Sequence, residues 1–125
     1  MILETRSEAE LFRQLGAYES PSQIFLTPSH RYECHAIAWF EAKLLLQVVD
    51  DFGEPSWHRM ERFHIVDGSI AEDWIINVFD VEPPRLVIGP RFVAESLASY
   101  NAMALKKPPQ IDLFLRRVAD RITGS

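Results

Sequence analysis

The sequence predicts an α+β fold: an antiparallel β-meander of about four to six strands, with an N-terminal helix and two C-terminal helices packed on one face. Three observations indicate this class. A capped helical pattern opens the chain, runs rich in β-branched and aromatic residues fill its middle, and the clearest helical periodicity comes last. The sequence shows no internal repeat, low-complexity segment or long linker, so we interpret residues 1–125 as a single α+β domain.

The first predicted element is a helix that begins near Ser7. Ser7 and Glu10 have the spacing of a capping box, in which each side chain bonds the backbone N–H of the other residue. Apolar residues follow at helical spacing, at Leu11, Phe12 and Leu15. Gly16 is a natural stop, so we expect the helix to end before it.

Three strands are expected next. Residues 23–27 form a short apolar run between two prolines, and residues 34–39 and 44–50 flank a turn within residues 40–43. The turn residues also have good helix propensity, which leaves a helical turn as an alternative. Residues 44–50 are almost continuously apolar, which indicates a central strand covered on both faces.

Residues 57–79 have the pattern of a β-hairpin. Two alternating runs flank the dipeptide Asp67-Gly68. Both of these residues tolerate the positive φ that a type I′ turn requires, and a two-residue turn fixes the register of the strands. We therefore expect the two runs to pair directly with each other.

The expected register divides this hairpin into two faces. Arg62 lies opposite Asp73, and His64 shares their face because side chains alternate along a strand. This mixed face is either an ordinary solvated side of the sheet or a working surface. The other face is richer in large apolar groups, and we expect it to pack against the helices. It carries Trp57, Phe63, Ile65, Ile70, Trp74, Ile76 and Val78.

The C-terminal third is expected to add one strand and two helices. Residues 85–88 form a strand that could join an edge of the sheet, and Pro90 suits the first position of a helix. Two prolines at 108–109 then break the chain before the last helix. One stripe of the earlier helix holds Val93, Leu97, Tyr100 and Ala104, and one stripe of the last helix holds Ile111, Phe114, Leu115, Val118 and Ile122.

The charge of the chain is acidic and uneven. The formal net charge is −5, so the broadly basic surface typical of nucleic-acid binding is missing, and we expect no nucleic-acid partner. Residues 50–82 hold nine acidic and two basic residues, a local net charge of −7. Such a segment either keeps the protein soluble or steers it toward a basic partner.

Cysteine usage and hydropathy bear on the compartment. The single cysteine, Cys34, cannot form an internal disulfide, which fits a reducing environment. The first residues carry charges early and lack a long apolar run, so we expect no signal peptide. No stretch approaches the ~20 apolar residues of a membrane span. We therefore expect a cytoplasmic protein without a membrane partner.

No metal, cofactor or covalent site is expected. Cys34 and His35 would point to opposite faces of a strand, while His58 and His64 would lie about 20 Å apart along one. The same alternation separates the Cys34 thiol from His35 as a nucleophile and its base. The sequence contains no nucleophile elbow, phosphate-binding glycine loop or dinucleotide fingerprint. We therefore favour a protein that binds over one that catalyses.

A resemblance supplies an alternative function. Part of the 57–79 pattern resembles the last hairpin of the SnoaL-like and wider NTF2-like families, through Arg62, Phe63, Asp67, Gly68, Ile70, Glu72 and Trp74. The resemblance implies a cone-shaped α+β barrel that holds a small ligand, with His64 or Asp73 as the interior acid or base of an isomerase-type enzyme. Those families place long helices before the meander, whereas one short helix precedes it here.

The preferred hypothesis is a small acidic intracellular protein that acts by protein–protein interaction, such as a toxin-neutralising immunity protein or a regulatory adaptor. Its partner is expected to be another protein, with a basic surface as the complement of residues 50–82. The side chains expected to bind it are Asp50, Asp51, Glu54, Arg62, His64 and Asp73. Interface anchors are available in Trp39, Trp57, Trp74 and Tyr100. A homodimer, formed through an exposed sheet face or the helix that carries Phe114 and Val118, is a third interpretation.

Overall fold

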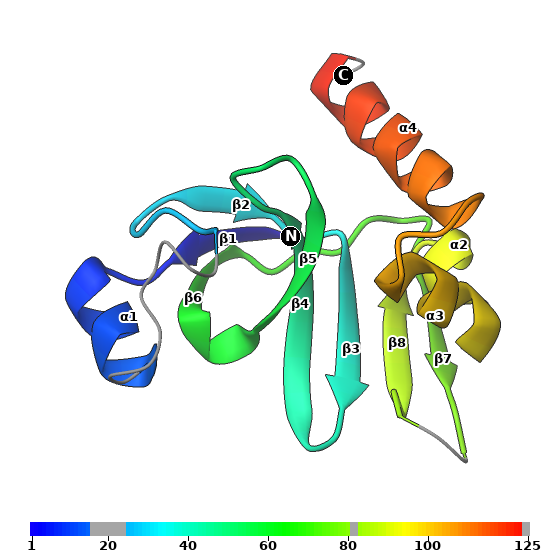
Figure 1. Cartoon of the computed structure of the whole chain (residues 1–125), viewed down its shortest axis with the longest axis horizontal. Helices are drawn as coiled ribbons and strands as arrows, with labels where there is room; N and C mark the ends of the chain where they lie inside the picture. The colour runs from blue at the N-terminus through cyan, green and yellow to red at the C-terminus, as the bar shows by residue number, and fades with distance from the viewer. Residues whose placement is uncertain (16–24, 81–82, 124–125) are drawn as a thin grey trace.

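The computed structural model describes residues 1–15, 25–80 and 83–123, and its strands form two antiparallel sheets (Figure 1). The smaller sheet has the strand order β2-β1-β6, and the larger sheet has the order β5-β4-β3-β8-β7. The predicted α+β class is confirmed, with a short helix near the N-terminus and further helices at the C-terminal end. The strands are β1 (Ile2–Thr5), β2 (Arg31–Glu33), β3 (Ala36–Phe40), β4 (Lys43–Val49), β5 (Pro55–Arg59), β6 (Phe63–Asp67), β7 (Ile75–Val78) and β8 (Leu86–Gly89). The helices are α1 (Glu8–Leu15), the 3₁₀-helix η2 (Met60–Arg62), α2 (Arg91–Ala94), α3 (Leu97–Ala104) and α4 (Gln110–Thr123).

Helix α1 is capped as the sequence predicts. The Glu10 backbone N–H donates to the Ser7 hydroxyl at 3.3 Å. In return, the Glu10 carboxylate accepts from the Ser7 backbone N–H at 3.4 Å and from the Ser7 hydroxyl at 3.0 Å. This reciprocal pair is a capping box, and it satisfies backbone donors that the first helical turn leaves unbonded. The predicted stop at Gly16 lies outside the described residues.

The N-terminal region differs from the prediction in its strands. Strand β1 was not expected, yet it forms the middle of the smaller sheet, between β2 and β6. Residues 23–24 of the predicted strand 23–27 lie outside the described residues, and residues 25–27 are not in a strand. Here the carbonyl of Thr27 accepts a hydrogen bond from the buried Thr5 hydroxyl instead of joining a ladder.

The hairpin of β3 and β4 is confirmed. Its turn consists of Glu41 and Ala42, which have φ values of 48° and 62°, between the paired residues Phe40 and Lys43. Positive φ at both positions is what a type I′ turn requires, and its twist suits the strands on either side. Strand β4 is central, as predicted, because it lies between β3 and β5.

The hairpin predicted over residues 57–79 is wrong. Strand β6 pairs with β1, and β7 pairs with β8, so the two runs do not face each other. The reason is local as well as topological, because neither Asp67 nor Gly68 has a positive φ. Instead, the Asp67 carboxylate accepts from the backbone N–H and the hydroxyl of Ser69 at 2.9 and 2.7 Å. After this local turn the chain leaves β6 and does not reverse direction to pair with it.

The predicted inner face of that hairpin is wrong for most of its members. Phe63 is buried, and Trp57 and Trp74 are partly buried, but the four aliphatic residues are exposed. These four are Ile65, Ile70, Ile76 and Val78. They are exposed because the helices pack on the opposite side of β7, and β6 belongs to a different sheet.

The C-terminal elements follow the prediction with local differences. Strand β8 lies between β3 and β7 and not at an edge. Pro90 is the residue before α2 and not its first residue. The predicted long stripe is divided between α2 and α3, because the Ser96 hydroxyl accepts from the Ser99 backbone N–H at 3.0 Å and starts a new helix. In α4, Phe114 is buried whereas Leu115 is exposed.

Two apolar clusters hold these layers together. The first joins the two sheets and includes Leu3, Leu26, Cys34, Ile37, Leu46, Val48 and Phe63. The second lies between the larger sheet and the C-terminal helices and includes Ala36, Ala38, Val87, Val93, Ala94, Tyr100, Met103 and Phe114. Within the described ranges, no helix has both the length and the apolar character needed to cross a bilayer.

Candidate interaction surface

One face of the five-stranded sheet is covered at one end only. A row of side chains crosses this face through neighbouring register positions, from Ile76 to Ile88, Ile37, Leu46 and His58. Ile76 on β7 is 63% exposed, whereas Ile37 on β3 is 8% exposed and Leu46 on β4 is 2% exposed. Exposure therefore falls along the row from β7 toward β5.

A second row on the same face is open for more of its length. It runs from Val78 through Leu86 and Trp39 to Leu44. Val78 is 69% exposed and Trp39 is 43% exposed, while Leu44 and Leu86 are partly buried. We define the open apolar face by the exposed side chains of Trp39, Ile76 and Val78 together with the partly buried Leu44, Leu86 and Ile88. Leu44 and Ile88 border the buried cluster that joins the two sheets.

The smaller sheet explains where this face is closed. Leu3 of β1 and Phe63 of β6 belong to the same buried cluster as Leu46 and Val48 of β4. The smaller sheet is thus packed over the β3–β5 end of the larger sheet, and Figure 1 shows its strands on that side of the molecule, away from β7. Beyond this contact Ile76 and Val78 of β7 are exposed, while Leu86 and Ile88 of β8 are partly buried.

The other face of the larger sheet is closed by the helices. Ala36, Ala38 and Val87 are fully buried there, and these small side chains let α2 and α3 approach the strands closely. Asn77 of β7 also points to this side, and its side-chain amide donates to the carbonyls of Ala94 and Glu95 at 3.2 and 2.9 Å. The open apolar face is therefore the opposite side of β7, which the helices cannot reach.

The acids expected to bind a partner at residues 50–54 organise their own loop. The Asp50 carboxylate accepts from the backbone N–H groups of Phe52 and Glu54 at 2.9 and 3.1 Å. The Asp51 carboxylate accepts from the Tyr32 hydroxyl at 2.6 Å and from the Thr27 hydroxyl at 2.8 Å. The Glu54 carboxylate lies 3.1 Å from the Lys106 ammonium group. These contacts fix the β4–β5 loop, while Asp51 and Glu54 remain at the surface.

Arg62 contacts a buried histidine. An Arg62 Nη lies 3.0 Å from Nδ1 of His58, and the Ser56 hydroxyl lies 2.8 Å from its Nε2. Burial, followed by the positive charge of Arg62, lowers the pKa of His58 to about 4. Because a guanidinium group only donates, Nδ1 of the neutral ring accepts this hydrogen bond and Nε2 carries the proton toward Ser56.

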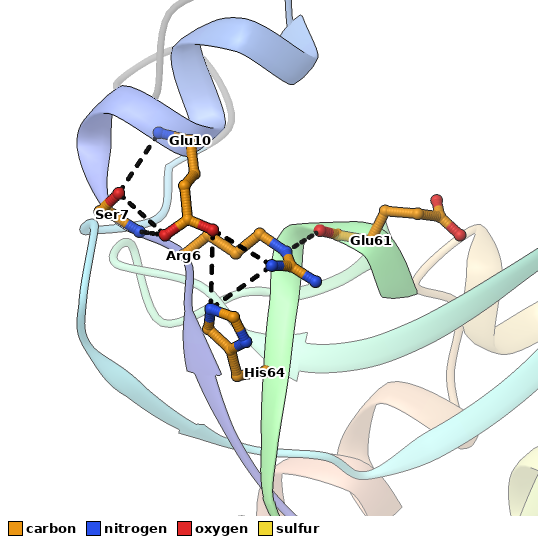
Figure 2. A network of polar contacts seen from close by, with 5 residues as sticks. All are labelled: Arg6, Ser7, Glu10, Glu61 and His64. Carbon is orange, nitrogen blue, oxygen red and sulfur yellow. Dashed lines mark hydrogen bonds and ion pairs between the residues drawn. The ribbon is translucent and has the colours of Figure 1, made fainter.

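His64 belongs to a surface network with α1, drawn in Figure 2. Its Nε2 lies 3.4 Å from Nη1 of Arg6 and 3.7 Å from Oε2 of Glu10. Arg6 also donates to the carboxylate of Glu10 at 3.1 Å and to the carbonyl of Glu61 at 2.6 Å. Hydrogen bonds from Ser7 and Arg6 hold the pKa of Glu10 below its ordinary value. The network connects α1 to the start of β6, because Glu10 of the capping box also contacts Arg6 and His64.

Asp73 is paired with α4. Its two carboxylate oxygens contact two nitrogens of the Arg117 guanidinium, one of them at 2.9 Å. The structure thus places Arg62 beside β5, His64 beside α1 and Asp73 beside α4. The hairpin on which the resemblance to the SnoaL-like and NTF2-like families rests is not formed. The expected cross-strand pair of Arg62 and Asp73 is therefore not formed either.

A groove beside α4 has no single chemical character. It has a volume of about 770 Å³, and it opens to the surface between α4 and residues 69–73. Its lining mixes both signs of charge with apolar groups, including Glu33, Glu72, Asp73, Leu113, Arg116 and Arg117. In the described part of the chain, no three metal-binding side chains gather into a site. Burial raises the pKa of the Cys34 thiol to about 11, which keeps it protonated and poorly nucleophilic.

Comparisons with known proteins returned no matching family model, no matching curated protein and no matching solved structure. The functional assignment consequently rests on the geometry of this chain. The sequence does not predict the open apolar face, although it offers Trp39 as an interface anchor. The alternation of Ile76 and Val78 is visible in the sequence, but alternation does not tell which side of a strand is covered.

Proposed function

We propose that this protein acts by binding another protein through the open apolar face, as a toxin-neutralising immunity protein or a regulatory adaptor does. The observation that carries the proposal is the exposure of Trp39, Ile76 and Val78 on one uncovered side of the sheet. Contiguous exposed apolar side chains on a folded protein mark interaction surfaces, because covering them removes apolar area from water.

The composition of the face suits an interface. Trp39 is a large side chain with a polar N–H, a type that often contributes most to binding energy. Around it are aliphatic side chains on three neighbouring strands, which form a rigid surface that loses little conformational entropy on binding. A sheet face of this kind can accept a partner without rearranging.

Charge favours a basic partner. Residues 50–82 have a net charge of −7, and the exposed acids Glu72 and Asp80 stand on either side of β7. Acidic side chains around an apolar centre raise the association rate of a basic protein and disfavour acidic ones. Basic active or nucleic-acid-binding surfaces of toxins are one class of partner with this chemistry.

The buried titratable groups support a binding role over a catalytic one. The Cys34 thiol has a raised pKa, and the neutral His58 ring is held between Ser56 and Arg62. Neither side chain lines the open apolar face. No particular observation favours the small-molecule enzyme that the resemblance suggested, so we develop the binding function alone.

Photo-crosslinking in the native cell tests this function. A photoreactive phenylalanine analogue at Val78 places the probe on the open apolar face, and the same analogue at Val66 is the matched control. Val66 is also an exposed valine on a strand, but it lies on β6 of the smaller sheet. We expect a defined adduct with a second protein from position 78 that position 66 does not give. No adduct from position 78, or the same adduct from both positions, would contradict the proposal.

A further inference from the structure

We propose that β7 binds its partner by strand addition: an extended segment of another protein, with alternating apolar residues between lysines or arginines, pairs with the free edge of β7. This inference rests on the proposed function and names the kind of partner. Three features of the edge carry it, namely the direction of its backbone groups, its lack of protecting residues and the charges at its ends.

The backbone of β7 presents donors and acceptors to the outside. The Phe79 N–H donates to the Arg85 carbonyl at 2.8 Å, which fixes the alternation of the β7–β8 ladder. Asn77 and Ile75 are then bonded to β8, while the N–H and C=O groups of Ile76 and Val78 point away from it. Because β7 is outermost, these groups have no strand partner among the described residues.

The opposite edge of the same sheet is protected, and β7 is not. Strand β5 begins at Pro55 and ends at the exposed Arg59. Its Trp57 ring packs against the Tyr100 ring, with centroids 5.6 Å apart. Proline and charge are the usual means of preventing strands from adding to an edge. Strand β7 contains neither, and three of its four residues, Ile75, Ile76 and Val78, are of the apolar, β-branched kind that pairs readily.

The charges around β7 specify the occupant. Residues 63–84 contain no lysine or arginine, and the exposed Glu72 and Asp80 lie just beyond the two ends of the strand. The exposed Arg85 lies across from Phe79, next to the C-terminal end of β7. A second copy of this chain is disfavoured, since antiparallel pairing of two β7 strands brings the acids before one strand toward the acids after the other. Lysine or arginine on both sides of an incoming strand would instead meet these carboxylates.

Side-chain alternation adds a requirement for apolar residues. Ile76 and Val78 point to the open apolar face, so every second residue of an added strand lies beside them and extends that face. The incoming segment therefore carries apolar residues at alternate positions, and backbone pairing to Ile76 and Val78 supplies the remaining contacts.

A synthetic peptide of sequence KKVTVTVKK is a suitable probe. With isotope-labelled protein, we expect saturating peptide to slow hydrogen exchange of the Ile76 and Val78 amides about tenfold or more, without such slowing at Ile65 or Val66. A peptide with glutamate in place of each lysine is expected to bind about tenfold more weakly at low salt. No slowing at Ile76 and Val78, or equal binding of the two peptides, would overturn the proposal.

Two further measurements keep the test independent of folding defects. Val78→Pro removes an outward N–H without removing a bond to β8, and we expect it to abolish peptide binding. Two N-methylated peptides test the same point without changing the protein, each with methyl groups on the N–H groups of one edge of the peptide strand. We expect only the peptide methylated on the edge that pairs with β7 to lose binding. Concentration-dependent protection of Ile76 and Val78 without peptide would identify a second copy as the occupant and contradict the inference.

The outcomes separate this inference from the proposed function. If the crosslink from position 78 forms but the peptide does not bind, and the Val78→Pro protein still copurifies with the crosslinked partner, the face binds proteins without strand addition. The inference then fails and the proposed function stands. If neither the crosslink nor the peptide complex forms, both fail.

Discussion

The two ends of the five-stranded sheet carry similar side chains in opposite surroundings. Leu46 and Ile37 at one end are sealed beneath the smaller sheet, while Ile76 in the same row is 63% exposed. The difference does not come from the side chains in this row, which are apolar on β4, β3 and β7 alike. It comes from the width of the second layer, because three strands cannot cover five. An apolar strand position thus becomes buried or exposed according to what packs above it.

The largest expected effect compares the two ends directly. Leu46→Ala should lower the free energy of unfolding by about 2–5 kcal/mol, because the buried cluster cannot close the resulting cavity. Ile76→Ala should change it by less than about 1 kcal/mol, since the side chain is already in water. Urea unfolding of both variants measures these values. Similar losses for the two substitutions would mean that the β7 end is also covered.

The histidine that ends the covered row gives the next effect. The pKa of His58 is lowered from 6.5 to about 4, so as pH falls through this window the unfolded chain takes up a proton that the folded protein does not. Folding stability should therefore decrease as pH falls through the window, by an amount on the order of 2–3 kcal/mol.

The variant His58→Gln isolates this contribution. Its free energy of unfolding, measured in urea at a series of pH values, should depend less steeply on pH than that of the unaltered protein, because glutamine does not titrate. The remaining slope of the variant reports all other groups together. Equal slopes for the two proteins would show that the ring is not kept neutral by burial.

A glycine beneath the helices tests how tightly the closed face is packed. A Cβ added at Gly89 would lie 2.9 Å from the Cβ of Ala36, so Gly89→Ala should destabilise the protein by about 1–3 kcal/mol. Gly68→Ala is the control, since its nearest neighbour would be Cγ2 of Ile65 at an ordinary 3.7 Å. Thermal or urea unfolding of both compares them, and a Gly89→Ala protein as stable as the control would show that β8 and β3 can move apart at this position.

The smallest expected effect concerns binding alone. Trp39→Ala should weaken association with the crosslinked partner by roughly 1–2 kcal/mol, about tenfold. Phe52→Ala is the matched control, because Phe52 is another exposed aromatic residue but lies in the β4–β5 loop. Fluorescence anisotropy with the labelled partner gives both affinities. Equal loss from the two variants would remove Trp39 from the interface.

Elements with local signals were predictable. The capping box of Ser7 and Glu10, the β3–β4 hairpin and the α4 helix all depend on residues close together in sequence. The candidate site was not predictable in this way. Its two most exposed members, Ile76 and Val78, are predicted from the sequence to be in the core. The prediction fails because apolar residues alternate along a strand in the same way whether or not another layer covers them.

The sequence by itself determined the α+β class, the order of most elements and the concentration of acidic charge in residues 50–82. Caps, turns and periodicity depend on residues a few positions apart, so they can be recognised in the sequence. Only the tertiary structure decided that β6 leaves β7 to pair with β1, since that choice depends on partners about sixty residues apart in the chain. The same choice placed the smaller sheet over β4 and left β7 uncovered, which is how an apparent core strand becomes an exposed edge.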